Sequence, residues 1–418
     1  MKVHIITIGD EILIGQTLNT NAAFIGSLLS ENSITITKTS VVGDNEEEII
    51  NEFGSCFQKN DVVISTGGLG PTHDDVTRNA VQKYFKSELV LDPETLQSIE
   101  ERFKKLKREV TDVNRNQAMV PNNAKVIKNN FGTAPGLWIE ENEKVLVVLP
   151  GVPHEMQAMM NSFVLPSLKS KLNENDLVVK KLNLLTTGIG ESTLFERLGD
   201  IEQILKGEKM AFLPSPSGTK IRITASGNDE ESVNNKLLEI EQKIRSLVGR
   251  YIYGKGEEEL AGVVGRLLNE RGLTLAIAES CTGGNISNLI TNFSGSSNYF
   301  ERGIVCYSNA AKVELLKVDE DMIAKFGAVS LEVARQMSEG IRAISGTDIG
   351  LAITGIMGPG GGNIEKPVGT VYIGLCDRNV CTAQKFSFAD DRILNKQRAT
   401  YAALELLRKY ILGIQENV

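Results

Sequence analysis

The sequence predicts an α/β protein in which two α/β domains are joined by a small α+β module. Short β-branched runs that end in glycine alternate with helical patterns at the start of the chain, and the same alternation returns after a middle stretch of different texture. At 418 residues the chain is also too long for one ordinary hydrophobic core. We therefore expect domains over 1–165 and 259–418, with a module over 166–253 between them.

The first domain is predicted to contain a parallel sheet. The runs KVHIITIG, DVVISTGG and KVLVVLPG are predicted strands, and the periodicity predicts helices over 21–31 and 46–58 between them. Strands that alternate with helices in this way indicate parallel pairing. Ligands bind beyond the carboxyl ends of such strands, so the expected binding loops are GDEILIGQTLNTN, GGLGPTHDDVT and PGVPHEM.

The rest of the chain divides at a charged passage. Within 166–253 the sequence predicts a strand, a turn and a helix in LNLLTTGIGESTLFERL, then the strand TKIRITASG and an amphipathic helix. GKGEEEL, at 254–260, is charged and contains glycine, so we expect a linker there. The last domain is predicted to hold a helix over 259–271, the strands TLAIAES, GIVCYS, DIGLAIT and GTVYIGLC, and a closing helix over 394–411.

Composition excludes several classes of function. The net charge is −8 and no basic stripe is present, so nucleic acid is not an expected direct partner; the basic run at 104–108 is interpreted as a solvated helix face. No apolar run approaches ~18 residues, and the N-terminal MKVHIITIGDEI is a first strand and not a signal peptide, so we expect a cytoplasmic protein without a membrane span. Five irregularly spaced cysteines without a CxxC pair argue against a structural zinc site and a disulfide framework.

The loop STGGLGPTHDDVT is the most informative part of the first domain. Its candidate groups are Gly67, Gly68, Gly70, His73, Asp74 and Asp75. The glycines let the backbone approach an anion and offer N–H groups to phosphate oxygens. Two adjacent carboxylates would repel that anion unless a divalent metal lay between them. The alternative, in which the two aspartates only cap a helix, stays open, as does a plain loop role for His73 and His154.

In the last domain, TLAIAESCTGG places Ser280, Cys281 and Thr282 at a strand-to-helix turn. The three histidines of the chain are all at or before position 154, so no imidazole in this part can activate a nucleophile. Three routes remain: a Cys281 thiolate, metal-activated water, or a lysine base. The metal route is weakened because this part has no histidine and no tight acidic cluster.

Lys312 is the candidate base, because it follows the strand GIVCYS in the first turn of the next helix, where a cation is disfavoured. Lowering a lysine pKa from about 10.4 to about 7 requires roughly 4 to 5 kcal/mol of environmental bias. An exposed helix lysine is the alternative. The glycine-rich GIMGPGGG presents backbone N–H groups, Thr354 stands at a strand end, and Arg392 pairs either with a substrate phosphate or with Asp390 or Asp391.

The N-terminal motifs resemble a known family. TGGLGPTHDDVT is similar to the signature of the MoaB/MogA molybdopterin-binding fold, and together with IGDEILIGQTLNTN and LPGVPHEM it resembles the CinA family. The resemblance implies a phosphate loop with two catalytic aspartates, at Gly67, Gly68, Gly70, Asp44 and Asp75. It further implies that ADP-ribose is hydrolysed to AMP and ribose 5-phosphate with a divalent metal and K⁺. The further candidates for metal or water binding are Asp10, Glu11, Asp74 and Glu155. A pterin- or nucleotide-binding module without turnover remains the alternative.

Residues 260–410 resemble the PncC family of nicotinamide mononucleotide deamidases in AESCTGG, GSSNYFERGIVCYSNAAK, GAVS, TGIMGPGGG and KPVGTVYIG. The resemblance implies a Ser/Lys dyad, with Ser280 as nucleophile and Lys312 as base, and no cofactor. Substrate-binding positions are expected at Cys281, Thr282, Gly283, Ser297, Tyr307, Asn309, Thr354, Gly358 and Arg392. Whether Ser280 or a serine of the GSS turn attacks stays open at this point; Ser280 is chosen because its turn can direct backbone N–H groups at an oxyanion.

Together the motifs resemble full-length CinA over nearly the whole chain. This implies a bifunctional hydrolase of pyridine-nucleotide salvage, acting on nicotinamide mononucleotide and ADP-ribose, and a homodimer. The competence-related name of the family suggests a different alternative, an interaction factor in DNA uptake and repair. The acidity of the chain counts against direct DNA contact, although it does not exclude a protein partner.

Overall fold

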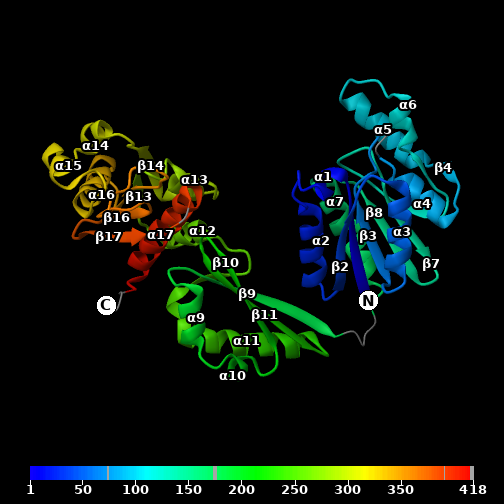
Figure 1. The fold of residues 1–418 in the computed structure, drawn as a ribbon, viewed down its shortest axis with the longest axis horizontal. Coiled ribbons are helices and arrows are strands. Elements are labelled where there is room, and N and C mark those ends of the chain that lie inside the picture. The colour runs from blue at the N-terminus through cyan, green and yellow to red at the C-terminus, as the bar shows by residue number, and fades with distance from the viewer. Residues whose placement is uncertain (73–74, 173–176, 390, 415–418) are drawn as a thin grey trace. The chain divides into compact units, whose positions relative to one another are not determined.

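The computed structural model describes residues 1–72, 75–172, 177–389 and 391–414 (Figure 1). They form two compact units: Met1–Lys180 with Ser226–Val233, and Lys181–Ala225 with Asn234–Val418. No helix in these described ranges is long and apolar enough to cross a membrane.

The first unit is built on a six-stranded sheet in the order β2-β1-β3-β8-β7-β6. Its strands are β1 (Lys2–Ile8), β2 (Thr35–Val42), β3 (Val62–Thr66), β6 (Ala124–Ile127), β7 (Gly136–Glu141) and β8 (Lys144–Leu149). The four strands from β2 to β8 pair in parallel, which confirms the predicted parallel α/β sheet. The antiparallel edge of β7 and β6 was not predicted: Asn142 and Glu143, both with positive φ, fold β7 directly back onto β8 as a hairpin.

Helices cover both faces of this sheet. The helices of the unit are α1 (Asp10–Leu13), α2 (Thr20–Glu31), α3 (Glu46–Phe57), α4 (Thr77–Phe85), α5 (Pro93–Lys105), α6 (Asp112–Asn116), α7 (Pro153–Met159), a π-helix (Met160–Val164) and α8 (Leu165–Lys169), and a short pair β4 (Leu89–Leu91) and β5 (Met119–Pro121) lies among them. Ile5 of β1 packs in one core with α2 and α7, whereas Ile6 packs in the other with α3 and α4. This alternation follows from the two-residue period of a strand.

The middle module is a four-stranded sheet in the order β10-β11-β9-β12 with helices beside it, and the pairs β10–β11 and β12–β9 are antiparallel. Its elements are β9 (Val178–Thr186), α9 (Glu191–Leu198), α10 (Ile201–Leu205), β10 (Lys209–Ser215), β11 (Gly218–Gly227), α11 (Glu230–Val248), a 3-10 turn (Gly249–Tyr251) and β12 (Ile252–Lys255). The predicted linker at 254–260 is shorter in the structure, because Gly254 and Lys255 still pair with Leu185 and Leu184 of β9. Only 256–259 connect β12 to the next helix.

The last part of the chain has a five-stranded sheet in the order β14-β13-β15-β16-β17. Its elements are α12 (Leu260–Glu270), β13 (Leu275–Glu279), α13 (Asn285–Thr291), η3 (Ser296–Asn298), β14 (Phe300–Val305), α14 (Asn309–Leu316), α15 (Glu320–Phe326), α16 (Leu331–Ser345), β15 (Ile349–Gly355), β16 (Thr370–Cys376), β17 (Cys381–Ser387) and α17 (Arg392–Leu412). β14, β13 and β15 are parallel, and α12, α13 and α17 cover one face while α14 and α16 cover the other. The predicted closing helix is confirmed and begins two residues earlier, where Asp391 caps it.

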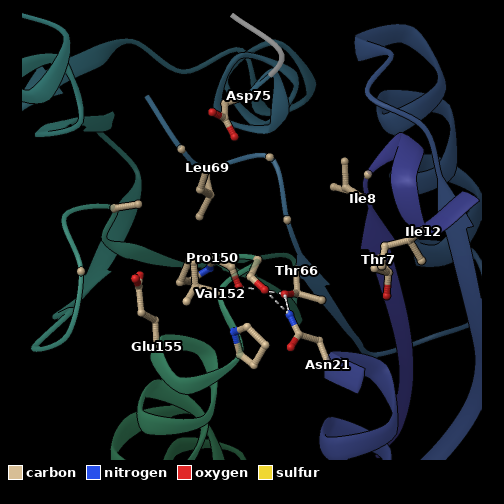
Figure 2. Close-up of a pocket in the computed structure, with 18 of the residues that line it drawn as sticks. Thr7, Ile8, Ile12, Asn21, Thr66, Leu69, Asp75, Pro150, Val152 and Glu155 are labelled. Carbon is tan, nitrogen blue, oxygen red and sulfur yellow. Dashed lines mark hydrogen bonds between the residues drawn. The ribbon is translucent and has the colours of Figure 1, made fainter. Parts of the chain in front are cut away.

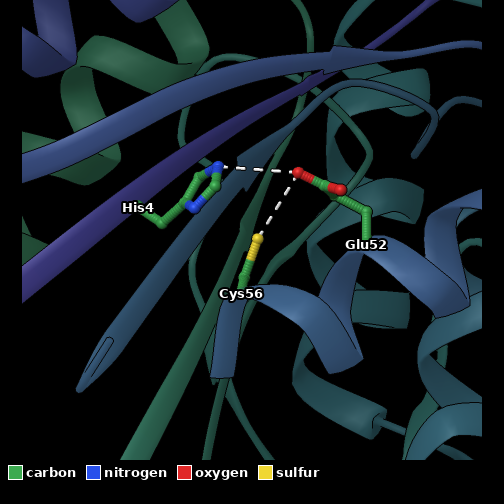
Figure 3. Close-up of side chains that lie close together, drawn as sticks. All are labelled: His4, Glu52 and Cys56. Atoms are coloured by element: carbon green, nitrogen blue, oxygen red, sulfur yellow. Dashed lines mark hydrogen bonds and ion pairs between the residues drawn. The ribbon is translucent and has the colours of Figure 1, made fainter. Parts of the chain in front are cut away.

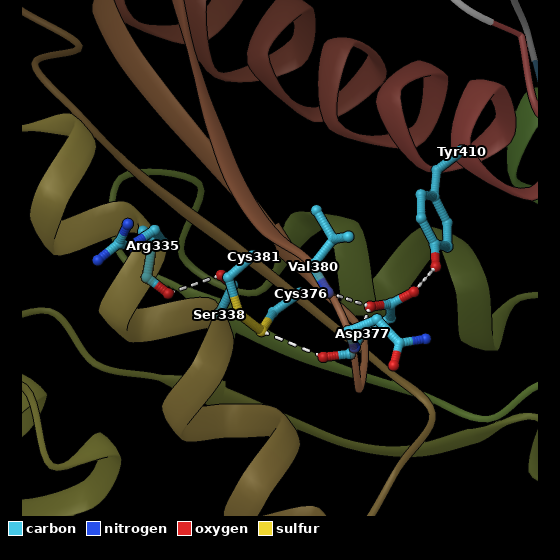
Figure 4. The surroundings of a disulfide bond; sticks show 8 residues. Arg335, Ser338, Cys376, Asp377, Val380, Cys381 and Tyr410 are labelled. Atoms are coloured by element: carbon cyan, nitrogen blue, oxygen red, sulfur yellow. Dashed lines mark hydrogen bonds between the residues drawn. A yellow bond between two sulfur atoms is a disulfide. The ribbon is translucent and has the colours of Figure 1, made fainter.

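A disulfide joins Cys376 and Cys381, which the cysteine spacing did not predict (Figure 4). The two residues are register partners on β16 and β17, so the hairpin itself brings their side chains together. Cys56, Cys281 and Cys306 are free thiols. Periodicity in the sequence identifies both strands, but it does not give their register, and only the register makes the two cysteines neighbours.

Candidate active sites

A cavity of about 650 Å³ lies beyond the carboxyl ends of β1, β3 and β8 (Figure 2). This is the edge of the sheet at which the sequence places the binding loops. The predicted site residues that line the cavity are Glu11, Asp44, Gly67, Gly68, Gly70, Asp75 and Glu155. Asp10 does not line it, whereas His73 and Asp74 are outside the described residues. His154 is exposed and makes an edge-to-face contact with Phe131.

Gly67 and Gly68 are required by the turn that leaves β3. Gly67 has a φ of +114°, and a β-carbon there would lie 2.0 Å from the Ile8 carbonyl oxygen. Gly68 has a φ of +64°, and a β-carbon would lie 2.1 Å from Thr77 Oγ1. Thr77 in turn donates through its hydroxyl to the Gly67 carbonyl at 3.0 Å and through its N–H to the Gly68 carbonyl at 3.1 Å. The glycines therefore allow α4 to start directly beside the strand ends.

Asp75 does not cap the following helix, which was the alternative considered for it. The N-cap of α4 is Val76, without a side-chain hydrogen bond. The Asp75 carboxylate instead accepts from the Thr72 N–H at 2.8 Å and from the Thr72 hydroxyl. It also lies against Gly70, where a β-carbon would be 2.5 Å from Oδ2. Asp75 thus closes the glycine loop on itself while lining the cavity.

Negative charge is concentrated at the cavity. Asp44 and Asp10 exchange hydrogen bonds, since each carboxylate accepts from the backbone N–H of the other residue, at 3.0 and 3.1 Å. Burial raises the pKa of Asp44, and the negative charges of Asp10, Glu11 and Asp75 act in the same direction. Glu155 accepts from Asn129 Nδ2 at 2.7 Å.

These carboxylates do not form a ready-made protein cage for a metal. In the described ranges, the single group of three or more histidine, cysteine or acidic donors that lie within binding distance of one another is elsewhere, at His4. A cation in this cavity would therefore be held by one or two carboxylates together with phosphate oxygens of a ligand and water, which is how proteins commonly hold Mg²⁺. The donor set fits such a cation.

Residues outside the three predicted binding loops also line the cavity, and Asn21, inside the first of these loops, was not singled out. Arg102 of α5 and Gln117, which follows α6, both line the cavity, although the neighbouring basic run at 104–108 is exposed as predicted. Asn21 donates to Thr66 Oγ1 at 3.0 Å and to the Gly151 carbonyl at 2.7 Å. The side-chain oxygens of Asn21 and Gln117 are buried and accept no hydrogen bond from the described residues. Whether a residue on a helix reaches the end of a strand that is distant in the sequence depends on packing, which local sequence patterns do not reveal.

The second site is at the carboxyl end of β13, where the chain turns into α13. Ser280 is 7% exposed, and its N–H donates to the Ile353 carbonyl at 3.1 Å, which continues the sheet. Gly283 and Gly284 have φ values of +63° and +94°, so the turn needs glycine at both positions. Within the described chain, the N–H groups of residues 281 and 282 donate to no other residue. The two backbone N–H groups that directly follow Ser280 in the chain are therefore available to a ligand.

Glu279, the residue before Ser280, holds this turn in place and was not identified from the sequence. Its carboxylate is completely buried. Oε2 accepts from the N–H groups of Gly284 and Ile286 at 3.0 and 3.1 Å, and Oε1 accepts from the N–H and hydroxyl of Ser287 at 2.8 and 2.7 Å. The carboxylate therefore satisfies the free N–H groups at the start of α13, where negative charge is favourable.

Lys312 lies against Ser280. Its Nζ is 3.1 Å from Ser280 Oγ and donates to the carbonyls of Cys306 and Tyr307 at 3.0 and 3.2 Å. The side chain is 1% exposed, and burial lowers the pKa of its amine. No carboxylate pairs with Lys312 in the part of the chain that the structure describes. The alternative of an exposed helix lysine is wrong.

The neighbouring thiol is in an environment that opposes a thiolate. Cys281 is buried, and burial raises the pKa of its thiol to about 12. A reactive cysteine needs the opposite, a pKa below the ordinary value. The route through a Cys281 thiolate is therefore disfavoured at neutral pH.

Two cations of α17, Arg392 and Lys396, lie close to predicted residues of the second site. Arg392 donates to the Gly358 carbonyl at 2.7 Å and to the Tyr307 hydroxyl at 3.3 Å, which joins three predicted residues. Asp391 does not pair with Arg392 in these contacts, because its carboxylate caps α17; Asp390 is outside the described residues. Lys396, one turn later, was missed: a β-carbon on Gly283 would lie 3.5 Å from its Nζ. The i, i+4 spacing of Arg392 and Lys396 was the available signal.

The other residues that were predicted to bind the substrate of the second site differ in burial and in location. Thr354, at the end of β15, is buried and donates to the Ala328 carbonyl at 2.9 Å, and Asn309 is the exposed first residue of α14. Thr282 is buried, and its hydroxyl has no partner among the described residues.

Ser297 precedes β14, whose first residue pairs with the first residue of β13. It is therefore at the opposite sheet edge from Ser280, roughly 16 Å away along the strand, and the structure does not bring the two serines together.

The fold and sites define a multidomain protein with a molybdopterin-binding type of α/β domain at one end. Family models match residues 4–170 as a probable molybdopterin binding domain, 182–254 as the damage-inducible protein CinA KH domain, and 257–411 as the CinA C-terminal domain.

The chain belongs to the CinA family. It is 42% identical to a CinA-like protein of Kosmotoga olearia over 99% of this chain and 100% of that one. It is 41% identical to a protein of Clostridium novyi whose name describes it as competence-damage inducible, over 99% of both chains. A crystal structure of CinA from Thermoplasma acidophilum is 37% identical and covers 40% of this chain and 96% of its own, with a TM-score of 0.37. The two relatives confirm the expected family, and the sheets described above confirm the expected α/β fold.

Proposed function

We propose that the second unit hydrolyses the carboxamide of nicotinamide mononucleotide, giving nicotinic acid mononucleotide and ammonia. The observation that carries this proposal is the 3.1 Å contact between the buried Lys312 amine and the Ser280 hydroxyl, in a site without histidine. A nucleophile with a base in hydrogen-bond reach is the signature of covalent catalysis. The resemblance of residues 260–410 to nicotinamide mononucleotide deamidases supplies the substrate.

The contacts of Lys312 can be kept by the uncharged amine, which is the form that acts as a base. A neutral amine has two N–H bonds and one lone pair. In the structure Lys312 Nζ donates to the carbonyls of Cys306 and Tyr307 and to Ser280 Oγ. When the amine is uncharged, it can keep the two carbonyl bonds and accept the proton of the Ser280 hydroxyl with its lone pair. Because burial lowers the lysine pKa, this form is present at a lower pH than for a solvated lysine.

The reaction would then proceed in two steps, the formation of an ester on Ser280 and its hydrolysis. Ser280 Oγ attacks the carboxamide carbon while its proton moves to Lys312 Nζ, and the C–N bond breaks as that proton passes to the departing ammonia. The resulting ester on Ser280 is attacked by water, whose proton goes to Lys312 and then to Ser280 Oγ as the ester bond breaks. We assign the N–H groups of residues 281 and 282 to the stabilisation of the oxyanion in both steps, because they donate to no other described residue. Arg392 and Lys396 supply positive charge for the substrate phosphate.

The experiment is to incubate the full chain with nicotinamide mononucleotide and quantify ammonia and nicotinic acid mononucleotide. The wild type is expected to form both in equal amounts, and Ser280→Ala neither. Ser297→Ala is the matched control, because that serine lies at the other sheet edge. A Ser280→Ala protein with wild-type turnover, or a Ser297→Ala protein without turnover, would contradict the assignment of the nucleophile.

We propose that the first unit hydrolyses the pyrophosphate of ADP-ribose to AMP and ribose 5-phosphate, with a divalent metal and K⁺. The support is a cavity of about 650 Å³ that combines a glycine loop, the carboxylates of Asp44 and Asp75, and the cation Arg102. A bound divalent metal would neutralise charge that develops on the phosphate oxygens. Asp44, Asp75 and Glu11 are the residues that would hold it, and Arg102 would bind a phosphate directly.

AMP formation from ADP-ribose, with the divalent metal omitted and then restored, tests this second activity. We expect metal-dependent AMP that is lost in Asp44→Asn. Binding of ADP-ribose without AMP under any metal would instead identify a nucleotide-binding module. Absence of both activities would favour the role as an interaction factor in competence and DNA repair that the relatives' names suggest. A homodimer is part of the proposal, and sedimentation of the wild type measures it.

A further inference from the structure

A separate group of side chains lies halfway along β1, on the sheet face that packs against α3. Ile6 and Val63 on this face belong to the apolar core with Phe53. His4 occupies the same face and is 3% exposed, and Cys56 of α3 is 2% exposed. Glu52 lies one helical turn before Cys56, so both side chains point from α3 toward the strand. An imidazole, a carboxylate and a thiol thus meet within an apolar layer (Figure 3).

The three donor atoms have the spacing of metal ligands. Glu52 Oε1 lies 3.6 Å from His4 Nε2 and 3.6 Å from Cys56 Sγ, and all three atoms are within 4.8 Å of one another. For zinc with ordinary bond lengths, ideal tetrahedral geometry places nitrogen and oxygen ligands about 3.3 Å apart and sulfur and oxygen ligands about 3.5 Å apart. Ser40 Oγ, 2.8 Å from His4 Nε2, lies beside them as a fourth polar atom.

We propose that His4 Nε2, Glu52 Oε1 and Cys56 Sγ bind a zinc ion that links β1 to α3. The mixed nitrogen, sulfur and oxygen donors suit Zn²⁺ and disfavour Mg²⁺, which takes oxygen ligands. On binding, the Cys56 thiol loses its proton to solvent and its sulfur forms the bond to the metal, while His4 binds as the neutral imidazole. The carboxylate and thiolate charges then balance the ion.

This site is distinct from the cavity at the strand ends. None of the three ligands lines that cavity. No cysteine lines the cavity either, so a metal held there has no sulfur ligand among its lining residues. The charge of Lys38, the register partner of His4 on β2, acts on both His4 and Glu52 and opposes a cation at this place. Removing that charge is expected to strengthen metal binding.

The full chain, freed of metal with a chelator, is titrated with Co²⁺ and then with Zn²⁺ while absorbance is recorded. The wild type is expected to show a thiolate-to-Co²⁺ charge-transfer band that one equivalent of Zn²⁺ abolishes. Cys56→Ser should lose the band, and its Zn²⁺ affinity should fall by more than about 100-fold, beyond the loss typical of an outer-shell partner. Lys38→Met should keep the band and bind Zn²⁺ more tightly.

Two controls separate this site from other thiols and carboxylates. Cys281→Ser changes another buried thiol, and Glu48→Gln changes an exposed carboxylate one turn before Glu52 on α3. Both should keep the band. If Cys56→Ser does not fold, His4→Gln provides the second test and should also lose tetrahedral Co²⁺ absorption. A wild type without the band, or a band that persists in Cys56→Ser, would overturn the proposal.

Discussion

The buried carboxylate of Glu279 should set the stability of the Ser280 turn, and Glu279→Gln tests this with almost no change in volume. Four hydrogen bonds converge on the carboxylate. A glutamine can keep its oxygen at the Oε2 position and so retain the bonds from Gly284 and Ile286. Its amide nitrogen then faces Ser287, where the hydroxyl can accept, but the Ser287 N–H loses its acceptor.

The magnitude follows from these bonds. One buried N–H without an acceptor costs about 1–3 kcal/mol, and the remaining bonds weaken because the acceptor is no longer charged. Removing the desolvation penalty of a buried carboxylate offsets part of this loss. We expect a net destabilisation of about 3 kcal/mol, which is a fall of roughly 6–12 °C in the melting temperature of a unit of this size.

Thermal denaturation of the full chain, followed together with loss of the proposed amidase activity, measures the effect. Ser287→Ala is the matched control, since it removes a single hydroxyl bond and should cost about 1 kcal/mol. Glu279→Gln with a melting temperature equal to that of the wild type, or a larger effect in Ser287→Ala than in Glu279→Gln, would refute the reasoning.

Four further substitutions test separate parts of the sites. Cys281→Ser should retain most amidase activity, because burial keeps the thiol protonated; a complete loss with the fold intact would restore the thiolate route. Arg392→Ala should raise the KM for nicotinamide mononucleotide by about 10- to 100-fold, the worth of one charge-assisted hydrogen bond, with a smaller change in kcat. Lys396→Met should act in the same direction; an unchanged KM would remove it from the phosphate site. Arg102→Ala should raise the KM for ADP-ribose about tenfold and leave the amidase unchanged, and steady-state kinetics on both substrates will show whether it does.

Much of the fold could be predicted from the sequence, because the patterns that indicate strands and helices are local. The β-branched runs became β1, β3 and β8, and the helical periodicity became α2, α3 and α17. The antiparallel edge of β7 and β6 and the Cys376–Cys381 pair depend on hairpin register, which periodicity does not contain. The same limit applies to His4 and Cys56, which are 52 positions apart and meet through the packing of α3 on β1.

Site residues next to strand ends were predictable, and those from distant helices were not. Ser280 and Lys312 follow the neighbouring parallel strands β13 and β14, so their proximity follows from topology. Arg102 reaches its cavity from α5, which has no sequence feature that distinguishes it from a solvated helix. Ser297 shows the converse error, because a motif that is close to the site in sequence can lie at the other edge of the sheet.

The pH dependence of kcat/KM for nicotinamide mononucleotide, in the wild type and in Lys312→Met, tests the central claim most directly. Burial lowers the Lys312 pKa, so the active neutral amine forms as pH rises through that lowered value, and kcat/KM should rise and reach a plateau below the ordinary lysine range near 10.4. In Lys312→Met the activity should fall by about 10⁴-fold or more, and the rising limb should be absent. A Lys312→Met protein with wild-type kcat/KM and the same rising limb would contradict the account.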